Sequence, residues 1–302
     1  MKDLSNPFIS VIIPVFNDSE GLKKCLEALE NQTYSKILYE VIVVDNGSHE
    51  DVKSVVSQFG QAFAAYESQP GSYAARNKGL SLAKGEVIAF TDADCIPKPD
   101  WIEKGVANLL ACSNCGLVAG KIELFFKNQD QPTAAELYDS IMMNFRQDED
   151  IEKRKFGATA NLFTFKSVID NVGYFDDKLK SNGDLEWGHR VLLAGYKQIY
   201  ADDACVAHPA RYSLKQTYKR AVRIIGGRYS LKKKQGYSNK DFVREIATGV
   251  LPPFRLYFRV WSDKRLEGSK QKIQVILVTV FVKYAEVFEQ IRLQLGGRAT
   301  RG

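Results

Sequence analysis

The sequence lacks any apolar run long enough to cross a bilayer. A membrane-spanning helix needs about 20 consecutive apolar residues, whereas the stretch over 275–282, with Thr279 counted as apolar, is much shorter. The first apolar run, residues 8–16, contains Pro14 and ends at Asn17. We therefore expect this run to be a strand, and we expect neither a signal peptide nor a spanning helix.

Cysteine is scarce and scattered. The five cysteines are odd in number and mostly lie in apolar segments: Cys25, Cys95, Cys112, Cys115 and Cys205. Disulfide-stapled extracellular domains use more cysteines in paired spacing, so we interpret these as reduced thiols of a cytosolic protein. Cys112 and Cys115 form a single CxxC motif without a second pair, which favours plain packing over zinc binding or redox chemistry.

Acidic residues are depleted from one end of the chain. The net charge is +6, but residues 1–210 carry 21 Lys and Arg against 30 Asp and Glu, whereas residues 211–302 carry 21 against 6. Hydrophobic residues make up 45% and charged residues 26%, which is ordinary for a globular protein. An acidic body with a basic tail indicates that the tail meets an anionic surface.

Residues 8–94 alternate strand patterns with helix patterns, which is typical of a parallel sheet with crossover helices. We predict strands over 8–15, 40–44, 62–66 and from Val87, and helices from Asn17, over 51–59 and over 73–83. Beyond Cys95 we expect helices over 101–110 and 133–145, a strand over 117–125, a mobile charged loop over 147–155, and a strand within 156–163. These patterns predict an α/β fold with a mainly parallel central sheet and helices on both faces.

Two carboxylates follow the buried strand that begins at Val87. Asp92 and Asp94 are separated by one small residue, at the carboxyl edge of the sheet where open α/β folds bind ligands. Paired carboxylates repel each other, and a divalent cation with positions left for phosphate oxygens suits them. Their alternative role is to cap the helix that follows.

Other polar residues are expected near the same edge. Asp45 ends the second strand and could accept an imide N–H of a nucleotide base, or could cap a turn. Arg76 lies in the first turns of a helix directed at this edge, where it could meet a base or phosphate, or could be a surface arginine. His208 ends a strand-like segment and could be a metal ligand or a structural histidine.

A second acidic cluster begins a predicted helix. Asp184 could take a proton during catalysis, with Glu186 able to share the role, and Trp187 could offer its flat face to a sugar ring. A carboxylate at this position is also stabilised by the helix dipole alone.

Together these stretches resemble the family 2 glycosyltransferases with the GT-A fold. The matching segments are residues 10–17, 40–48, 71–81, 85–95 and 173–196, within roughly residues 8–210. We therefore expect a GT-A domain over 1–215 and a basic, amphipathic, mostly helical C-terminal extension over 216–302.

The resemblance implies a nucleotide-sugar donor, most often a UDP-sugar, and an inverting single displacement with Asp184 as general base. It implies that donor contacts come from Pro14, Phe16, Asn17, Asp45, Arg76 and Asp92, that Mn2+ or Mg2+ is held by Asp92, Asp94 and His208, and that Trp187 lines the acceptor. The family's usual Glu-Asp pair is Gly183-Asp184 here, so the supporting acid is missing. The Gln-x-x-Arg-Trp motif of processive synthases is absent after Asp184, which favours transfer of a single sugar to a glycan or lipid-linked acceptor.

Two other functions compete with a hexosyltransferase. A nucleotidyltransferase would share the half-domain, but it would carry a Gly-rich basic loop after the first strand, where residues 17–20 are acidic and polar. A non-catalytic scaffold would retain the fold and use the tail for assembly.

The tail contains a basic region around 219–234, a break at 251–253 and one long helix over 270–295. A basic amphipathic segment with aromatic residues fits a peripheral contact with the inner face of the cell membrane. A partner helix in a homodimer and a nucleic-acid-binding arm are the competing interpretations, and nucleic acid is the least favoured.

Overall fold

The computed structural model describes residues 6–142, 145–234 and 236–300, and these fall into two compact units. The first unit runs to Glu123 and also contains Phe145–Lys178 and Gly183–His208. The second contains the segment from Leu124, the short stretch Leu179–Asn182 and the chain from Pro209 onward. The expected domain boundary at residue 215 stays a prediction.

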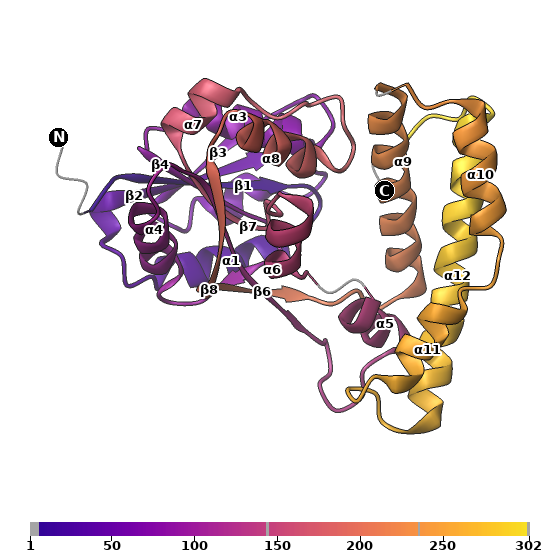
Figure 1. Cartoon of the computed structure of the whole chain (residues 1–302). Coiled ribbons are helices and arrows are strands. Elements are labelled where there is room, and N and C mark those ends of the chain that lie inside the picture. The colour runs from indigo at the N-terminus through magenta and orange to yellow at the C-terminus, as the bar shows by residue number, and fades with distance from the viewer. Residues whose placement is uncertain (1–5, 143–144, 235, 301–302) are drawn as a thin grey trace. The chain divides into compact units, whose positions relative to one another are not determined.

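An eight-stranded sheet in the order β3-β2-β1-β4-β7-β6-β8-β5 is the framework of the fold (Figure 1). Its strands are β1 (Ile9–Val15), β2 (Tyr39–Asp45), β3 (Ala62–Tyr66), β4 (Val87–Thr91), β5 (Ile96–Pro97), β6 (Cys115–Phe125), β7 (Asn161–Phe165) and β8 (Lys197–Pro209). The strands β3, β2, β1 and β4 are parallel, as their β-branched runs and crossover helices predict. The pairings β4 with β7, β6 with β7 and β5 with β8 are antiparallel.

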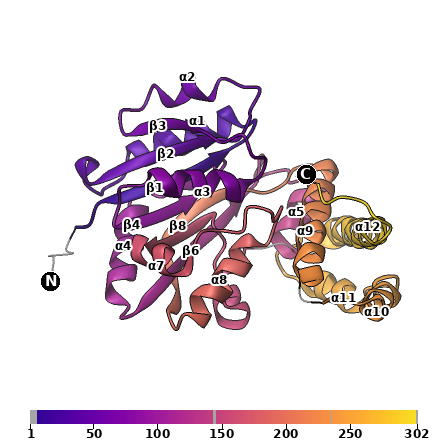
Figure 2. The ribbon, with the colours of Figure 1, turned by 90° about the horizontal axis from the view of Figure 1, so that it is seen from above.

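Helices cover both faces of this sheet (Figures 1 and 2). In the first unit they are α1 (Ser19–Glu30), α2 (Val52–Val56), α3 (Ser72–Leu82), α4 (Trp101–Ala111), α6 (Gln147–Glu149), α7 (Lys166–Val172) and α8 (Gly183–Leu193). Successive strand residues point to opposite faces. Thus Ile13 of β1 joins the core cluster that contains Leu22 of α1, whereas Ile12 lies against Gly79 of α3.

Helix α1, predicted from Asn17, begins at Ser19 and buries one apolar stripe. Leu22, Cys25, Leu26 and Leu29 are all buried. The N-cap is Asp18, whose carboxylate accepts a hydrogen bond from the Gly21 N–H at 3.1 Å. Asn17, where the helix was predicted to begin, adopts a left-handed backbone with φ of 51°. Asn is among the residues that tolerate this conformation, so Asn17 turns the chain between β1 and α1.

The loop predicted over 147–155 is wrong, because the segment is helical through α6 and a π-helical turn, Asp150–Arg154. Gln147 is buried, and its side-chain amide donates to the carbonyls of Gly120 at 2.8 Å and Asn161 at 2.9 Å. Ion pairs between Arg154 and Asp150, and between Lys153 and Glu149, span one turn each. The charges that suggested disorder therefore support each other along a helix.

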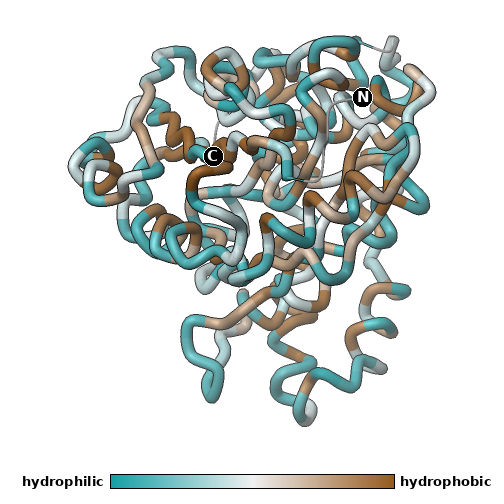
Figure 3. Tube along the Cα trace, turned by 90° about the vertical axis from the view of Figure 1, so that its left-hand side faces the viewer, coloured by the Kyte–Doolittle hydropathy of each residue, from teal (hydrophilic) through white to brown (hydrophobic). Residues whose placement is uncertain are grey.

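The second unit is helical. It contains α5 (Ala134–Met142), α9 (Leu214–Lys234), α10 (Asn239–Gly249), α11 (Phe254–Ser262) and α12 (Gly268–Gln294). The predicted long helix and the break at 251–253 are confirmed. The core of this unit is formed by Leu137, Tyr138, Ile141, Ala221, Val260, Leu266, Val275, Val278 and Val282. Hydrophobic and hydrophilic residues alternate along the helical turns (Figure 3). In the described part of the chain, no helix is long and apolar enough to cross a membrane.

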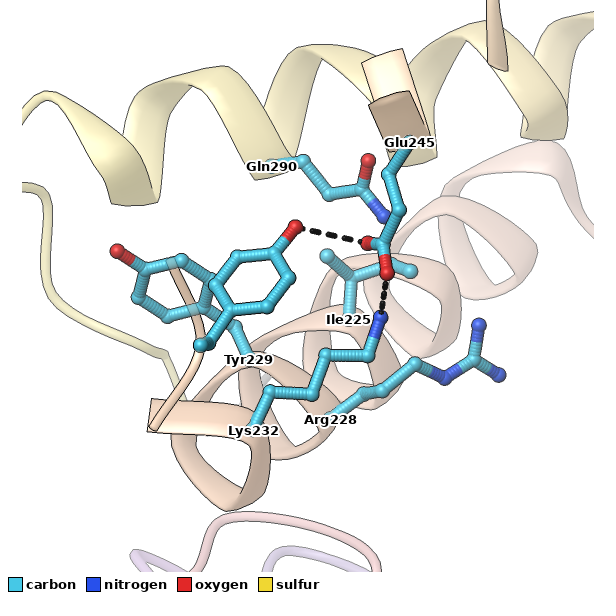
Figure 4. A pocket seen from close by; sticks show the side chains of 7 residues that line it. Ile225, Arg228, Tyr229, Lys232, Glu245 and Gln290 are labelled. Carbon is cyan, nitrogen blue, oxygen red and sulfur yellow. Dashed lines mark hydrogen bonds and ion pairs between the residues drawn. The ribbon is translucent and has the colours of Figure 1, made fainter. Parts of the chain in front are cut away.

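A small pocket lies among α9, α10 and α12 (Figure 4). Its lining residues are Ile225, Arg228, Tyr229, Lys232, Tyr237, Glu245 and Gln290. The Glu245 carboxylate accepts hydrogen bonds from the Lys232 ammonium and, at 2.9 Å, from the Tyr237 hydroxyl. These contacts join α9 to α10, so the polar groups stabilise the bundle.

Candidate active site

The loops that follow β1 and β2 are joined at the carboxyl edge of the sheet. The Asn17 N–H donates to the Ser48 hydroxyl at 2.9 Å, and the Asn17 side-chain carbonyl accepts from the His49 N–H at 2.8 Å. Asp45, at the end of β2, accepts from the Ser48 N–H at 2.9 Å. Pro14 is half-buried in β1 and Phe16 is exposed just beyond it. These residues lie where a donor could reach them, and their donor-binding roles stay predictions.

Asn46 organises the same edge and was missed by the sequence reasoning. It is buried, its amide donates to the carbonyls of Glu67 and Gln69, both at 2.8 Å, and its carbonyl accepts from the Gly71 N–H at 2.7 Å. It thereby ties the end of β3 to the start of α3. In the sequence, Asn46 stands out only because it directly follows Asp45 at the end of a predicted strand, and an ordinary turn residue would have the same position.

Arg76 and Asp92 form an ion pair within the first unit. The Arg76 guanidinium Nη2 lies 2.5 Å from Asp92 Oδ1, and the arginine side chain is only 5% exposed. Its Nε is buried and has no hydrogen-bond partner in the described part of the chain. A buried donor without a partner is costly, so an acceptor oxygen, such as one from a diphosphate, would satisfy it.

Asp94, Cys95 and His208 form a group with metal-ligand geometry. Donor atoms from the three residues lie within 4.8 Å of one another, and His208 Nε2 is 3.7 Å from Asp94 Oδ1. Burial raises the pKa of the Cys95 thiol well above its usual range, which disfavours the thiolate form that binds metals. The Asp94 carboxylate and the His208 imidazole remain, and together they offer oxygen and nitrogen ligands for a divalent cation.

Asp92 lies outside this group, because its carboxylate faces Arg76. Of the three predicted metal ligands, Asp92 therefore pairs with Arg76, whereas Asp94 and His208 could hold a metal ion. Of the described residues, Asp94 and His208 fit the implied metal best.

Asp184 lies in the first turn of α8, beside Tyr73 of α3. The Tyr73 hydroxyl donates to Asp184 Oδ1 at 3.2 Å and accepts from the Asp184 N–H at 3.3 Å. Burial raises the pKa of Asp184, and the nearby positive charge of Arg76 opposes this shift. A carboxylate with a raised pKa is a stronger base.

Gly183 precedes Asp184 where the family usually has a second acid. A Cβ added at Gly183 would lie 2.7 Å from ring atoms of Tyr73, closer than packed carbon atoms approach. The tyrosine ring thus occupies the space that a glutamate side chain would need.

The two remaining predicted site residues have structural contacts. The Glu186 carboxylate is paired with Arg190, at 2.8 and 2.9 Å. Trp187 is fully buried, its indole N–H donates to the Gly173 carbonyl at 3.0 Å, and its ring lies 5.4 Å from that of Phe175. The predicted acceptor contact at Trp187 is wrong, because a buried ring cannot offer a face to a sugar.

Comparison with known proteins identifies the family. The pattern of Glycosyl transferase family 2 matches residues 10–173. Glycosyltransferase AglE from Haloferax volcanii is 44% identical over 210 residues, which cover 68% of each protein. Pre-mycofactocin glycosyltransferase from Mycobacterium tuberculosis is 28% identical over 72% of this chain and 46% of its own length.

Solved structures agree on the fold. Mannosyltransferase PcManGT from Pyrobaculum calidifontis, in complex with GDP-Man and Mn2+, aligns with a TM-score of 0.64 and 17% identity over 96% of this chain and 88% of its own. TarS 1–349 from S. aureus, in complex with UDP, aligns with a TM-score of 0.55 and 16% identity over 96% and 92%. The chain therefore belongs to glycosyltransferase family 2 and has the GT-A fold.

Proposed function

We propose that the protein transfers one sugar from a nucleoside diphosphate sugar to an acceptor hydroxyl, by a single displacement that inverts the anomeric centre. The observation that carries this proposal is the grouping of Arg76 with Asp92, of Asp94 with His208, and of Asp184 with Tyr73 in the first unit. The first two pairs match the charge of a diphosphate and its metal. The third supplies a base.

The base-recognition residue of the donor site is Asp45. Its carboxylate ends β2 and can accept an imide N–H, a group that both uracil and guanine carry. A UDP-sugar was expected from the sequence, while the structural relatives were solved with UDP and with GDP-Man. Both UDP-sugars and GDP-sugars should therefore be tested as donors.

Arg76 would bind the leaving diphosphate, and Asp94 and His208 would hold a divalent cation. A bound divalent cation supplies Lewis-acid neutralisation of the negative charge that develops on the leaving group. Arg76 contributes a fixed guanidinium whose unpaired Nε can donate to a phosphate oxygen. Its pairing with Asp92 keeps the guanidinium in place before the donor arrives.

Asp184 removes the proton of the attacking hydroxyl. Its carboxylate oxygen is oriented by the Tyr73 hydroxyl, which holds it in a fixed position. Since the family's processive motif is absent, the product carries one added sugar, and we propose a glycan or lipid-linked acceptor.

Donor profiling tests the proposal. Nucleotide release from UDP- and GDP-sugars would be measured with and without Mn2+ or Mg2+, and the anomeric configuration of the product would be read by NMR. We expect metal-dependent release, an inverted product, and loss of release in Asp94→Ala, while Asp203→Ala, an exposed acid of β8, retains it. No binding of any nucleotide sugar, or a product with retained configuration, would refute the proposal.

A further inference from the structure

The nine-residue helix α11 exposes an aromatic face that the active site does not use. Phe254, Phe258 and Trp261 are 71%, 77% and 51% exposed. Their spacing of four and three residues places them on one side of the helix. Large apolar side chains grouped in this way on a surface mark an interaction site.

The opposite side of α11 anchors it in the second unit. Val260 is fully buried in the same core cluster as Leu266 and Val275. The Arg259 guanidinium donates to the Ile141 carbonyl of α5 at 3.3 Å. The helix is therefore held by its own inner residues, and packing within the unit does not require the outer aromatic rings.

Cations surround this face. Arg255 lies beside the aromatic residues and is exposed, and no acid occurs within Phe254–Ser262. The Lys272 ammonium lies 5.7 Å from the centre of the Trp261 ring. The first acid after the helix, Asp263, is neutralised by Arg265 at 2.7 Å. An apolar aromatic face with a positive rim complements a surface that is apolar inside and anionic outside.

The long helix α12 offers a second apolar stripe that is less suited to lipid. Phe281 lies 6.2 Å from the Tyr218 ring of α9, and the Tyr284 hydroxyl donates to the Val250 carbonyl at 3.3 Å, so parts of this stripe are engaged within the unit. The helix α12 also contains two acids, Glu286 and Glu289, whereas the only charged residues of α11 are arginines.

We propose that α11 docks the second unit on an anionic phospholipid bilayer. Phe254, Phe258 and Trp261 enter the boundary between headgroups and acyl chains, and Arg255 and Lys272 contact lipid phosphates. This assigns the membrane contact expected of the tail to α11, with Lys272 of α12 at its edge. The inference goes beyond the proposed function and depends on neither the donor nor the acceptor.

The tryptophans of the chain provide a direct readout. The sequence has three, all among the described residues; Trp101 and Trp187 are fully buried, and Trp261 is exposed. With vesicles of phosphatidylcholine and phosphatidylglycerol, we expect a blue shift of the emission and quenching by brominated lipid. Both signals should vanish in Trp261→Phe, which retains an aromatic ring on the face. Absence of quenching in the wild type would overturn the proposal.

Paired variants separate the docking face from general apolar exposure. Phe254→Ser with Phe258→Ser should lower the vesicle partition coefficient at least about tenfold, because two aromatic side chains no longer leave water. Ile37→Ser, which removes an 83% exposed side chain of the first unit, should leave it unchanged. Circular dichroism confirms that each variant folds. Partitioning that is lost only in Phe288→Ser, on α12, or that is equal on pure phosphatidylcholine, would overturn the proposal.

A second copy of the chain could cover the same face. Sedimentation without vesicles tests this, since a dimer that dissociates in Phe254→Ser with Phe258→Ser would assign the face to self-association and overturn lipid docking. Nucleotide-sugar binding, measured without vesicles, should be equal in wild type and variant. Loss of donor binding with intact vesicle binding would count against the proposed function alone.

Discussion

Asp184 and its neighbours combine a mechanistic requirement with a steric one. Tyr73 orients the carboxylate, and the same ring excludes a side chain from position 183. Tyr73 of α3 thus occupies the place of the second acid that this family usually carries before the base. A base positioned by tyrosine must work without a neighbouring carboxylate to raise its pKa, and burial supplies that shift.

Replacing Asp184 by Asn should lower turnover by about 10² or more, because removal of the acceptor proton is lost while donor contacts persist. The dissociation constant of the nucleotide sugar, measured by calorimetry, should change little. Glu186→Gln is the control, since its carboxylate is already paired with Arg190. The roles would be reversed if Glu186→Gln, and not Asp184→Asn, abolished turnover.

The raised pKa of Asp184 has consequences for both rate and stability. The base is active when ionised, so kcat should fall as pH decreases through this pKa, with an acid limb above the ordinary range of Asp. In the folded state ionisation is disfavoured, so the protein loses stability as pH rises from the ordinary Asp pKa through the raised one. Asp184→Asn should therefore raise the melting temperature near neutral pH, measured by calorimetry. An equal or lower melting temperature there would contradict the shift.

Gly183→Ala should disturb the site through Tyr73. The new methyl group meets the tyrosine ring, and overpacking of this kind typically costs about 1–3 kcal/mol in the free energy of unfolding. Denaturant unfolding and kcat would be measured beside Gly60→Ala, where a Cβ meets nothing within 4 Å. Equal effects in the two variants would show that the ring moves freely aside.

At the scale of elements, the strands were the most predictable part. Apolar β-branched runs give β1, β2 and β4 within a residue or two, because a strand buried on both faces leaves this signature. The helix over 147–154 could not be predicted in this way, since it depends on carbonyls that Gln147 meets only in the folded protein. Contacts between distant segments are not visible in local patterns.

Trp187 shows the same limit inside a correctly predicted helix. The sequence places it on α8, and Val191, one turn later, is also buried. The shared spacing was a signal for packing, but an aromatic residue beside a candidate base equally suggested sugar binding. Conversely, Arg76 resembles a surface arginine in sequence, but in the structure it is buried and paired with Asp92.

The helix α12 belongs to the core of its unit. Val278 is buried in the core cluster, whereas the adjacent Leu277 is exposed. Val278→Ala should lower the free energy of unfolding by about 1–3 kcal/mol because it removes buried methyl groups. Leu277→Ala should change it by less than about 0.5 kcal/mol. Denaturant melts of the two variants check this, and equal losses would mean that both faces of the helix are covered in solution.

In the molecule as a whole, the candidate site and the excess of positive charge lie in different units. The candidate site residues lie in the first, and the excess of Lys and Arg lies after residue 210. The sequence predicted this charge division and a boundary at residue 215. It did not predict that α5, far earlier in the chain, would join the core of the second unit.

A protein ended at residue 215 should consequently fold poorly. It would retain α5 but lose α9 and α12, whose Ala221, Val275 and Val278 cover the α5 side chains. We expect aggregation in size-exclusion chromatography and loss of the cooperative melt seen for the full chain. A monodisperse, stable fragment would instead support 1–215 as an independent domain.

The second unit is assembled from three separate stretches of the chain: one that begins at Leu124, the short stretch Leu179–Asn182, and the chain from Pro209 onward. No single break in the gene therefore separates the two units. A recombination event with one crossover after His208 would leave the first unit whole but would separate α5 and residues 179–182 from the rest of the second unit, so relatives that exchange C-terminal helices must exchange these internal segments as well. Inheritance should then keep the two units paired, and a family tree drawn from either should have the same branches.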